Sequence, residues 1–141
     1  MVRVELRVQI ARQASDVFAL LTDVERVPDW QATAVESHAD EPIAEGVRIL
    51  ERRHFLGHDA ETELEVTVFE PGRRFALRTL RGPVKLSIDH ELEERDGGTS
   101  VHVTAEGKPQ GLMRLAAPAV TARVRQELKR DFERLKAILE E

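Results

Sequence analysis

Apolar and polar residues alternate strictly at the start of the chain. From residue 2 to residue 10, valine, leucine and isoleucine occupy the even positions, and arginine, glutamate and glutamine occupy the odd ones. Successive side chains of a β-strand point to opposite faces, so this pattern predicts a strand with one buried face. Between residues 14 and 24 the apolar residues take helical spacing behind an aspartate in the first turn. We expect that helical region to end at Pro28.

The middle of the chain has the pattern of short strands joined by tight turns. The helical period disappears after Thr33, and three glycine turns follow. Pro71-Gly72 suits a type II turn, Gly82-Pro83 a type II′ turn and Gly97-Gly98 a type I′ turn. Besides the first strand, the predicted strands cover residues 33–39, 46–55, 59–69, 73–81, 84–95 and 99–108.

The chain closes with a predicted amphipathic helix from about Leu112 to Leu139, in which apolar residues recur three or four apart. Pro118 should kink this helix or mark a restart after one short turn. The side chains of this apolar stripe are small in the first half of the helix and large in the second half. A sheet covered by this helix should therefore close tightly at one end and leave room at the other. We expect Leu128, Phe132 and Leu135 to pack against the sheet. We expect Ala116, Ala117 and Ala119 to border a cavity.

The three glycine turns also predict which residues lie opposite each other, because a two-residue turn fixes the register of the strands it joins. All three turns place one set of apolar residues on the same face of the sheet. The predicted pairs are Leu92–Val103, His90–Ala105, His90–Phe75, Ile88–Leu77, Leu86–Thr79, Val66–Leu77 and Val68–Phe75.

A few polar residues share this predicted concave face. If the turn at Leu56-Gly57 keeps the same parity, the inward set includes Glu51 and Arg53, and a polar row crosses the sheet through Glu51, Thr62 and Arg81. Buried charges are costly unless paired, so this row indicates a pocket mouth or an internal ion pair. The candidate ligand-binding residues are Trp30, Glu51, Arg53, Thr62, Thr79, Arg81, His90, Ala116 and Val120.

Four of these candidates have a structural alternative. Glu51 and Arg53 can pair with each other at a sheet edge, or point outward if the turn has odd length. His90 can be a core histidine with both ring nitrogens satisfied. Trp30 can be ordinary core packing. The pair His54 and His58 with the neighbouring aspartate fits a solvated turn better than a zinc site, which needs three or four converging ligands.

Composition and charge narrow the function. The 141 residues suit one domain, and 41% hydrophobic with 33% charged residues is typical of a folded protein. A net charge of −5 argues against a nucleic-acid partner. The absence of cysteine excludes disulfides and thiolate chemistry. The sequence shows no signal peptide and no apolar run long enough to span a membrane, so we expect a cytoplasmic protein.

Several segments resemble the polyketide cyclase/dehydrase branch of the START-like (SRPBCC) superfamily. The similarity covers residues 17–30, with the helices and Trp30, then residues 69–75 and 96–101, Glu106-Gly107 and the C-terminal helix. The resemblance implies an α+β helix-grip fold, with two short helices after the first strand. In this fold, a curved seven-stranded antiparallel sheet wraps around a long C-terminal helix over a cavity. It also implies a ligand, since family members bind lipids, sterols, polyketides, quinones or plant hormones, and some are cyclases.

These observations favour one START-like domain over residues 1–141 that binds a small, largely apolar molecule as a carrier or sensor. The ligand would be lipid-, polyketide- or quinone-like, without a cofactor or metal, in a monomer or weak homodimer. One alternative is a cyclase or dehydratase, in which His90 acts as general base or acid and Arg81 or Arg53 orients a carbonyl. A second alternative is a protein-interaction module.

Overall fold

The computed structural model describes residues 2–55, 57–82, 84–108 and 115–141. Within these ranges the strands form one antiparallel sheet of seven, in the order β1-β7-β6-β5-β4-β3-β2. The two outermost strands are therefore β1 and β2. The strands are β1 (Val2–Ile10), β2 (Ala34–His38), β3 (Arg48–Phe55), β4 (His58–Glu70), β5 (Arg74–Arg81), β6 (Leu86–Arg95) and β7 (Gly98–Gly107).

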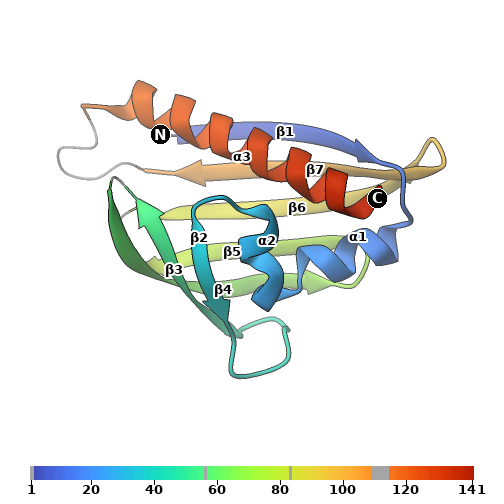
Figure 1. The fold of residues 1–141 in the computed structure, drawn as a ribbon, viewed down its shortest axis with the longest axis horizontal. Helices are drawn as coiled ribbons and strands as arrows, with labels where there is room; N and C mark the ends of the chain where they lie inside the picture. Colours follow the sequence, from blue (N-terminus) through green and yellow to red (C-terminus); the bar gives the residue numbers. More distant parts are fainter. Residues whose placement is uncertain (1, 56, 83, 109–114) are drawn as a thin grey trace.

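The helices lie on one side of this sheet. The short helices α1 (Ala14–Leu21) and α2 (Val27–Trp30), with the 3₁₀ turn η1 (Val24–Arg26), connect β1 to β2, and α3 (Ala117–Leu139) follows β7. Figure 1 shows α3 crossing the sheet, with α1 and α2 beside it on the same side and β2 and β3 bending around them. The predicted α+β class and helix-grip architecture are confirmed.

The turn between β6 and β7 lies one residue earlier than predicted. Asp96 and Gly97 both have positive φ, 54° and 76°, as a type I′ turn requires, and Arg95 lies opposite Gly98. The second glycine serves a different purpose, because a Cβ at Gly98 would come within 2.3 Å of the carbonyl oxygen of Ile10. The prediction for this turn was wrong by two register positions.

That error changes the cross-strand partner of each residue but not the face of the sheet on which its side chain lies. His90 lies opposite Val103 and Leu92 opposite Val101, instead of the predicted Ala105 and Val103. Because side chains in a strand alternate with period two, a slip of two positions keeps every side chain on its predicted face. His90 therefore points inward, as predicted.

Two β-bulges do change faces. The predicted pair Val66–Leu77 is confirmed, but an irregularity after Val66 places Phe69 opposite Phe75, where Val68 was expected. An extra residue in one strand inverts the facing of all that follow it. Phe69 therefore packs edge-on against Phe75, with ring centroids 6.2 Å apart, and Val68 lines a groove on the other side of the sheet.

The second bulge affects Arg81. Leu64 lies opposite Thr79, but Glu63 lies opposite Arg81, so β5 holds one residue more than β4 at this point. The predicted row of Glu51, Thr62 and Arg81 was therefore wrong. Glu51 does lie opposite Thr62, whereas Arg81 reaches the outward-facing Glu63, with Nη2 3.5 Å from Oε2.

The long helix begins later than predicted. It starts at Ala117 with Pro118 in its first turn, where a proline costs no backbone hydrogen bond, so Pro118 starts α3 and does not kink it. Leu112 lies outside the described residues. Phe132, Leu135 and Leu139, in the second half of α3, are buried in the main core cluster, and Leu128 packs against it.

We call the side of the sheet that faces α3 the inner face. The buried side chains of the inner face come from several strands, and α1 and α2 add apolar side chains of their own. In the described residues, the main core cluster consists of Ile10, Val17, Phe18, Leu20, Leu21, Val24, Trp30, Ile49, Val66, Phe75, Leu92, Val101, Val103, Phe132, Leu135 and Leu139.

Candidate functional site

The inner face carries one histidine among aromatic rings. His90 of β6 is 4% exposed and lies between Phe75 and Phe132, whose ring centroids are 5.8 Å and 5.7 Å from the imidazole. Its Nδ1 donates a hydrogen bond to the backbone carbonyl oxygen of Phe75, at 2.7 Å. Among the residues that the structure describes, Nε2 has no hydrogen-bonding partner. His90 is therefore a core histidine on one side only.

The protonation state of His90 follows from these surroundings. Burial lowers the pKa of His90 to about 4, and the hydrogen bond to Phe75 and the charge of Asp89 offset part of this effect. The imidazole is neutral at pH 7. Because a carbonyl oxygen can only accept, Nδ1 must carry the proton, and Nε2 is left as an acceptor with a free lone pair.

Trp30 of α2 is a second candidate residue whose ring contacts Phe132. It is 3% exposed, and its ring meets Phe132 edge-on with centroids 5.2 Å apart. Its Nε1 is buried without a hydrogen-bonding partner in the described part of the chain. Buried polar atoms without a partner are uncommon, so the indole N–H is an unused donor within the core.

Glu51 and Arg53 form the internal ion pair that the sequence left open as an alternative. Arg53 Nε donates to Glu51 Oε1 at 2.8 Å, and the two side chains are 25% and 4% exposed. Ser37 Oγ donates to the other Glu51 oxygen at 3.3 Å, while Arg53 also donates to Thr33 Oγ1 at 3.0 Å and to Gln31. This network joins β2 and β3 to the segment that follows α2.

A buried carboxyl that the sequence analysis missed faces the same corner. Asp131 of α3 is 7% exposed, and its Oδ1 accepts a hydrogen bond from the backbone N–H of Ala32 at 3.2 Å. Burial raises the pKa of Asp131, and Ala32, Arg130 and Arg53 oppose that rise. The signal was present in the sequence, because Asp131 is three residues after Leu128 and four before Leu135.

Of the three remaining polar candidates, Thr79 and Arg81 have a polar partner. Thr62 lies against Gly82, where an added Cβ would come within 3.2 Å of Oγ1. The hydroxyl oxygen of Thr79 accepts a hydrogen bond from the backbone N–H of Leu86, at 3.4 Å. Arg81 is exposed on the outer face. Among the predicted site residues in the described part of the chain, His90 Nε2, Trp30 Nε1 and the Thr62 hydroxyl have no hydrogen-bonding partner.

The two ends of the inner face differ in how well they are covered. Leu64 and Leu86 face inward, together with Thr62 and Thr79, yet all four are partly exposed. Val120 is partly exposed in the first half of α3, and Ala116, at the N-cap of the helix, is exposed. The inner face is therefore well covered under the second half of α3, and the described residues near its first half are only partly covered.

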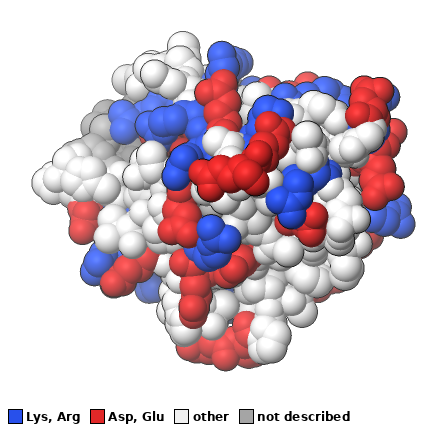
Figure 2. Space-filling model, turned by 45° about the vertical axis from the view of Figure 1, so that its right-hand side comes forward, with Lys and Arg blue, Asp and Glu red and all other residues white. Residues whose placement is uncertain are grey.

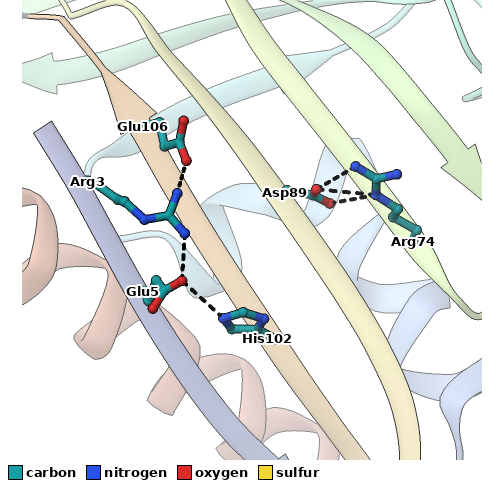
Figure 3. A network of polar contacts seen from close by, with 6 residues as sticks. All are labelled: Arg3, Glu5, Arg74, Asp89, His102 and Glu106. Atoms are coloured by element: carbon teal, nitrogen blue, oxygen red, sulfur yellow. Dashed lines mark hydrogen bonds and ion pairs between the residues drawn. The ribbon is translucent and has the colours of Figure 1, made fainter. Parts of the chain in front are cut away.

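The outer face of the sheet holds a groove of about 460 Å³. Charged side chains border it, and Figure 3 shows them paired with one another. Arg74 reaches Asp89 at 2.7 Å, and Arg3 reaches Glu5 at 2.7 Å and also Glu106. On the face seen in Figure 2, positive and negative side chains are likewise intermixed. In the described ranges, no group of three or more histidine, aspartate or glutamate residues is placed to hold a metal ion.

Comparison with known proteins agrees with this geometry. A curved antiparallel sheet closed by a long C-terminal helix defines the START-like class of folds. The chain belongs to the family described as polyketide cyclase / dehydrase and lipid transport, whose model matches residues 1–140. No curated protein sequence matches the chain significantly.

Solved structures share the fold at low sequence identity. The Zhui aromatase/cyclase from Streptomyces sp. R1128 has a TM-score of 0.82 at 19% identity, covering 98% of this chain and 93% of that one. A START superfamily protein from Mycobacterium smegmatis has a TM-score of 0.80 at 16% identity, covering 98% and 97%. A protein from Deinococcus radiodurans has a TM-score of 0.70 at 22% identity, covering 98% and 97%. These similarities establish the fold.

Proposed function

We propose that this protein is a carrier or sensor that binds a small, largely apolar molecule between the inner face of the sheet and the first half of α3. The observation that carries this proposal is the partial exposure of the inward-facing Leu64 and Leu86 of the sheet, together with that of Val120 on α3. Apolar side chains that face a helix are normally buried in a chain that fills its own core. A bound apolar molecule of the lipid, polyketide or quinone kind would cover them.

The polar residues favour binding over catalysis. A cyclase that uses His90 as general base needs an imidazole with a pKa near the working pH and a cation to orient a carbonyl. The pKa of His90 is lowered to about 4, Arg81 lies on the outer face, and Arg53 is held by Glu51, Thr33 and Gln31. For a carrier, the same residues need only shape and orient the ligand.

No helix in the described segments is long and apolar enough to cross a membrane. Native mass spectrometry of the purified protein, followed by solvent extraction, would detect and identify a copurified molecule.

A pair of variants of α3 tests where the ligand lies. Val120→Phe should fill the space under the first half of the helix and abolish binding, whereas Ala122→Phe, at an exposed position of the same helix, should leave binding unchanged. Both variants should unfold at temperatures close to that of the parent protein. Equal binding by the two variants would contradict the proposed location.

A further inference from the structure

The hydrogen-bonding state of His90 limits the chemistry of the ligand. Nδ1 is committed to the carbonyl oxygen of Phe75, and the neutral ring leaves Nε2 as an acceptor without a partner among the described residues. The next inward residues along β6 are Ile88 and then Leu86, and both are partly exposed. Beyond His90, the inward residues of β6 are therefore less completely covered than His90 itself.

We propose that the ligand donates a hydrogen bond to Nε2 of His90, and that it therefore carries a hydroxyl group, as an alcohol, enol or phenol, on an otherwise apolar body. This inference rests on the proposed function and narrows it. A fully oxidised quinone, an ether or a ketone offers only oxygen lone pairs. Such a group would face the lone pair of Nε2, and neither atom would gain a hydrogen bond.

The surroundings of His90 keep this acceptor in place. A second proton on the ring would turn Nε2 into a donor, and a nearby carboxylate would favour that proton. Asp89, the adjacent residue on β6, is bound on the outer face by Arg74, with Oδ2 2.7 Å from Nη2. The rings packed against His90, those of Phe75 and Phe132, carry no charge.

Two probes of nearly equal shape test the inference. 2-Naphthol has a hydroxyl that can donate, and 2-methoxynaphthalene carries a methyl in place of that hydrogen. Isothermal titration calorimetry at pH 7 measures the dissociation constant of each for the full chain. We expect 2-naphthol to bind about tenfold more tightly, which is the effect of one hydrogen bond made or missed in a buried site.

Two histidine variants assign the preference to one residue. In His90→Leu the preference for 2-naphthol should disappear. In His102→Leu it should persist, because His102 lies on the outer face beside Glu5, as Figure 3 shows. The comparison of the two probes on the unaltered protein requires no variant, so the test stands even if His90→Leu fails to fold.

The outcomes separate this inference from the proposed function. Tight binding of 2-naphthol with loss of the preference in His90→Leu supports both. Equal binding of the two probes to the unaltered protein overturns the hydroxyl inference and leaves an apolar binding site standing. Binding of neither probe contradicts the proposed function and this inference with it.

Discussion

The buried imidazole of His90 links the stability of the fold to pH. The unfolded chain takes up this proton near the ordinary pKa of 6.5, whereas the folded chain takes it up only near pH 4. Between these values the unfolded state binds more protons, so the free energy of unfolding rises with pH. The contribution is complete above pH 6.5 and is lost as the pH falls towards 4, by about 3 kcal/mol in total.

Urea unfolding at pH 7 and pH 5 measures this effect. The free energy of unfolding should fall between these two pH values by about 2 kcal/mol more in the parent protein than in His90→Leu, since leucine does not titrate. The difference between the two proteins removes the contributions of all other groups. Equal changes in both proteins would show that the imidazole is not desolvated as the structure indicates.

The ion pair of Glu51 and Arg53 leads to a second prediction at the scale of single residues, which concerns the stability of the fold. Arg53→Met leaves the buried Glu51 without its cation, and we expect a loss of about 3 kcal/mol in the free energy of unfolding. The double variant Glu51→Leu with Arg53→Met should recover much of that loss, because no unpaired charge remains. Chemical denaturation of the three proteins at pH 7 measures this.

The control is an ion pair of the same type on the surface. Arg26 and Asp29 are 48% and 52% exposed with Nε 2.9 Å from Oδ2, so Arg26→Met should cost less than about 1 kcal/mol. If Arg53→Met costs no more than Arg26→Met, the Glu51 carboxylate is solvated and the buried network is not a structural element.

At the scale of the elements, the strands and their facing could be predicted from alternation and glycine turns, but the bulges could not. The error at Asp96-Gly97 shifted two strands by two positions and did no harm to the inward placement of His90. The bulges after Val66 and before Arg81 insert a single residue and reverse the faces beyond it. Bulges depend on packing between strands, which a local pattern does not contain.

The same distinction applies to the candidate site. The inward placement of His90 followed from parity, and that of Glu51 was one of two alternatives that depended on the turn at Leu56-Gly57. The partners of each polar atom depend on segments distant in the chain. The helical spacing of Asp131 indicates its buried side, but its partner does not follow from spacing, because the contact with Ala32 crosses 99 positions of the sequence. Periodicity predicts the direction of a side chain but not what meets it there.

Asp131 connects α3 to the segment after α2, and we expect this hydrogen bond to stabilise the fold. Asp131→Ala should remove the acceptor for the backbone N–H of Ala32 and cost about 1–3 kcal/mol in the free energy of unfolding. Asp131→Asn keeps a carbonyl acceptor and removes a charge whose pKa burial raises, so it should be at least as stable as the parent at pH 7. Thermal unfolding of both variants distinguishes the two effects, and equal losses would contradict a role for the acceptor.

At the scale of the whole molecule, the sheet and α3 form a structure that is closed at one end. The second half of α3 supplies Phe132, Leu135 and Leu139 to the core, and it also contacts α1 and α2 (Figure 1). The helical residues before Leu128 supply no fully buried side chain to the core of the described chain. The core contacts and the proposed binding site therefore belong to different parts of one helix.

This division predicts an uneven pattern of amide hydrogen exchange along α3. Local opening is easiest where few apolar contacts hold a segment, so residues 117–124 should exchange faster than residues 128–139 in the ligand-free protein. A ligand that lies under the first half of the helix adds contacts there. Saturating 2-naphthol should therefore slow exchange in residues 117–124 and change residues 128–139 much less.

Hydrogen exchange followed by mass spectrometry, with and without 2-naphthol, provides the measurement. The variant Val120→Phe is the control, because a side chain that occupies the site should slow exchange in residues 117–124 without ligand and remove the response to 2-naphthol. Uniform exchange along α3 would contradict the division of the helix. Protection confined to the strand residues that line the outer groove, beside Arg74 and Asp89, would place the ligand in that groove and not under the helix.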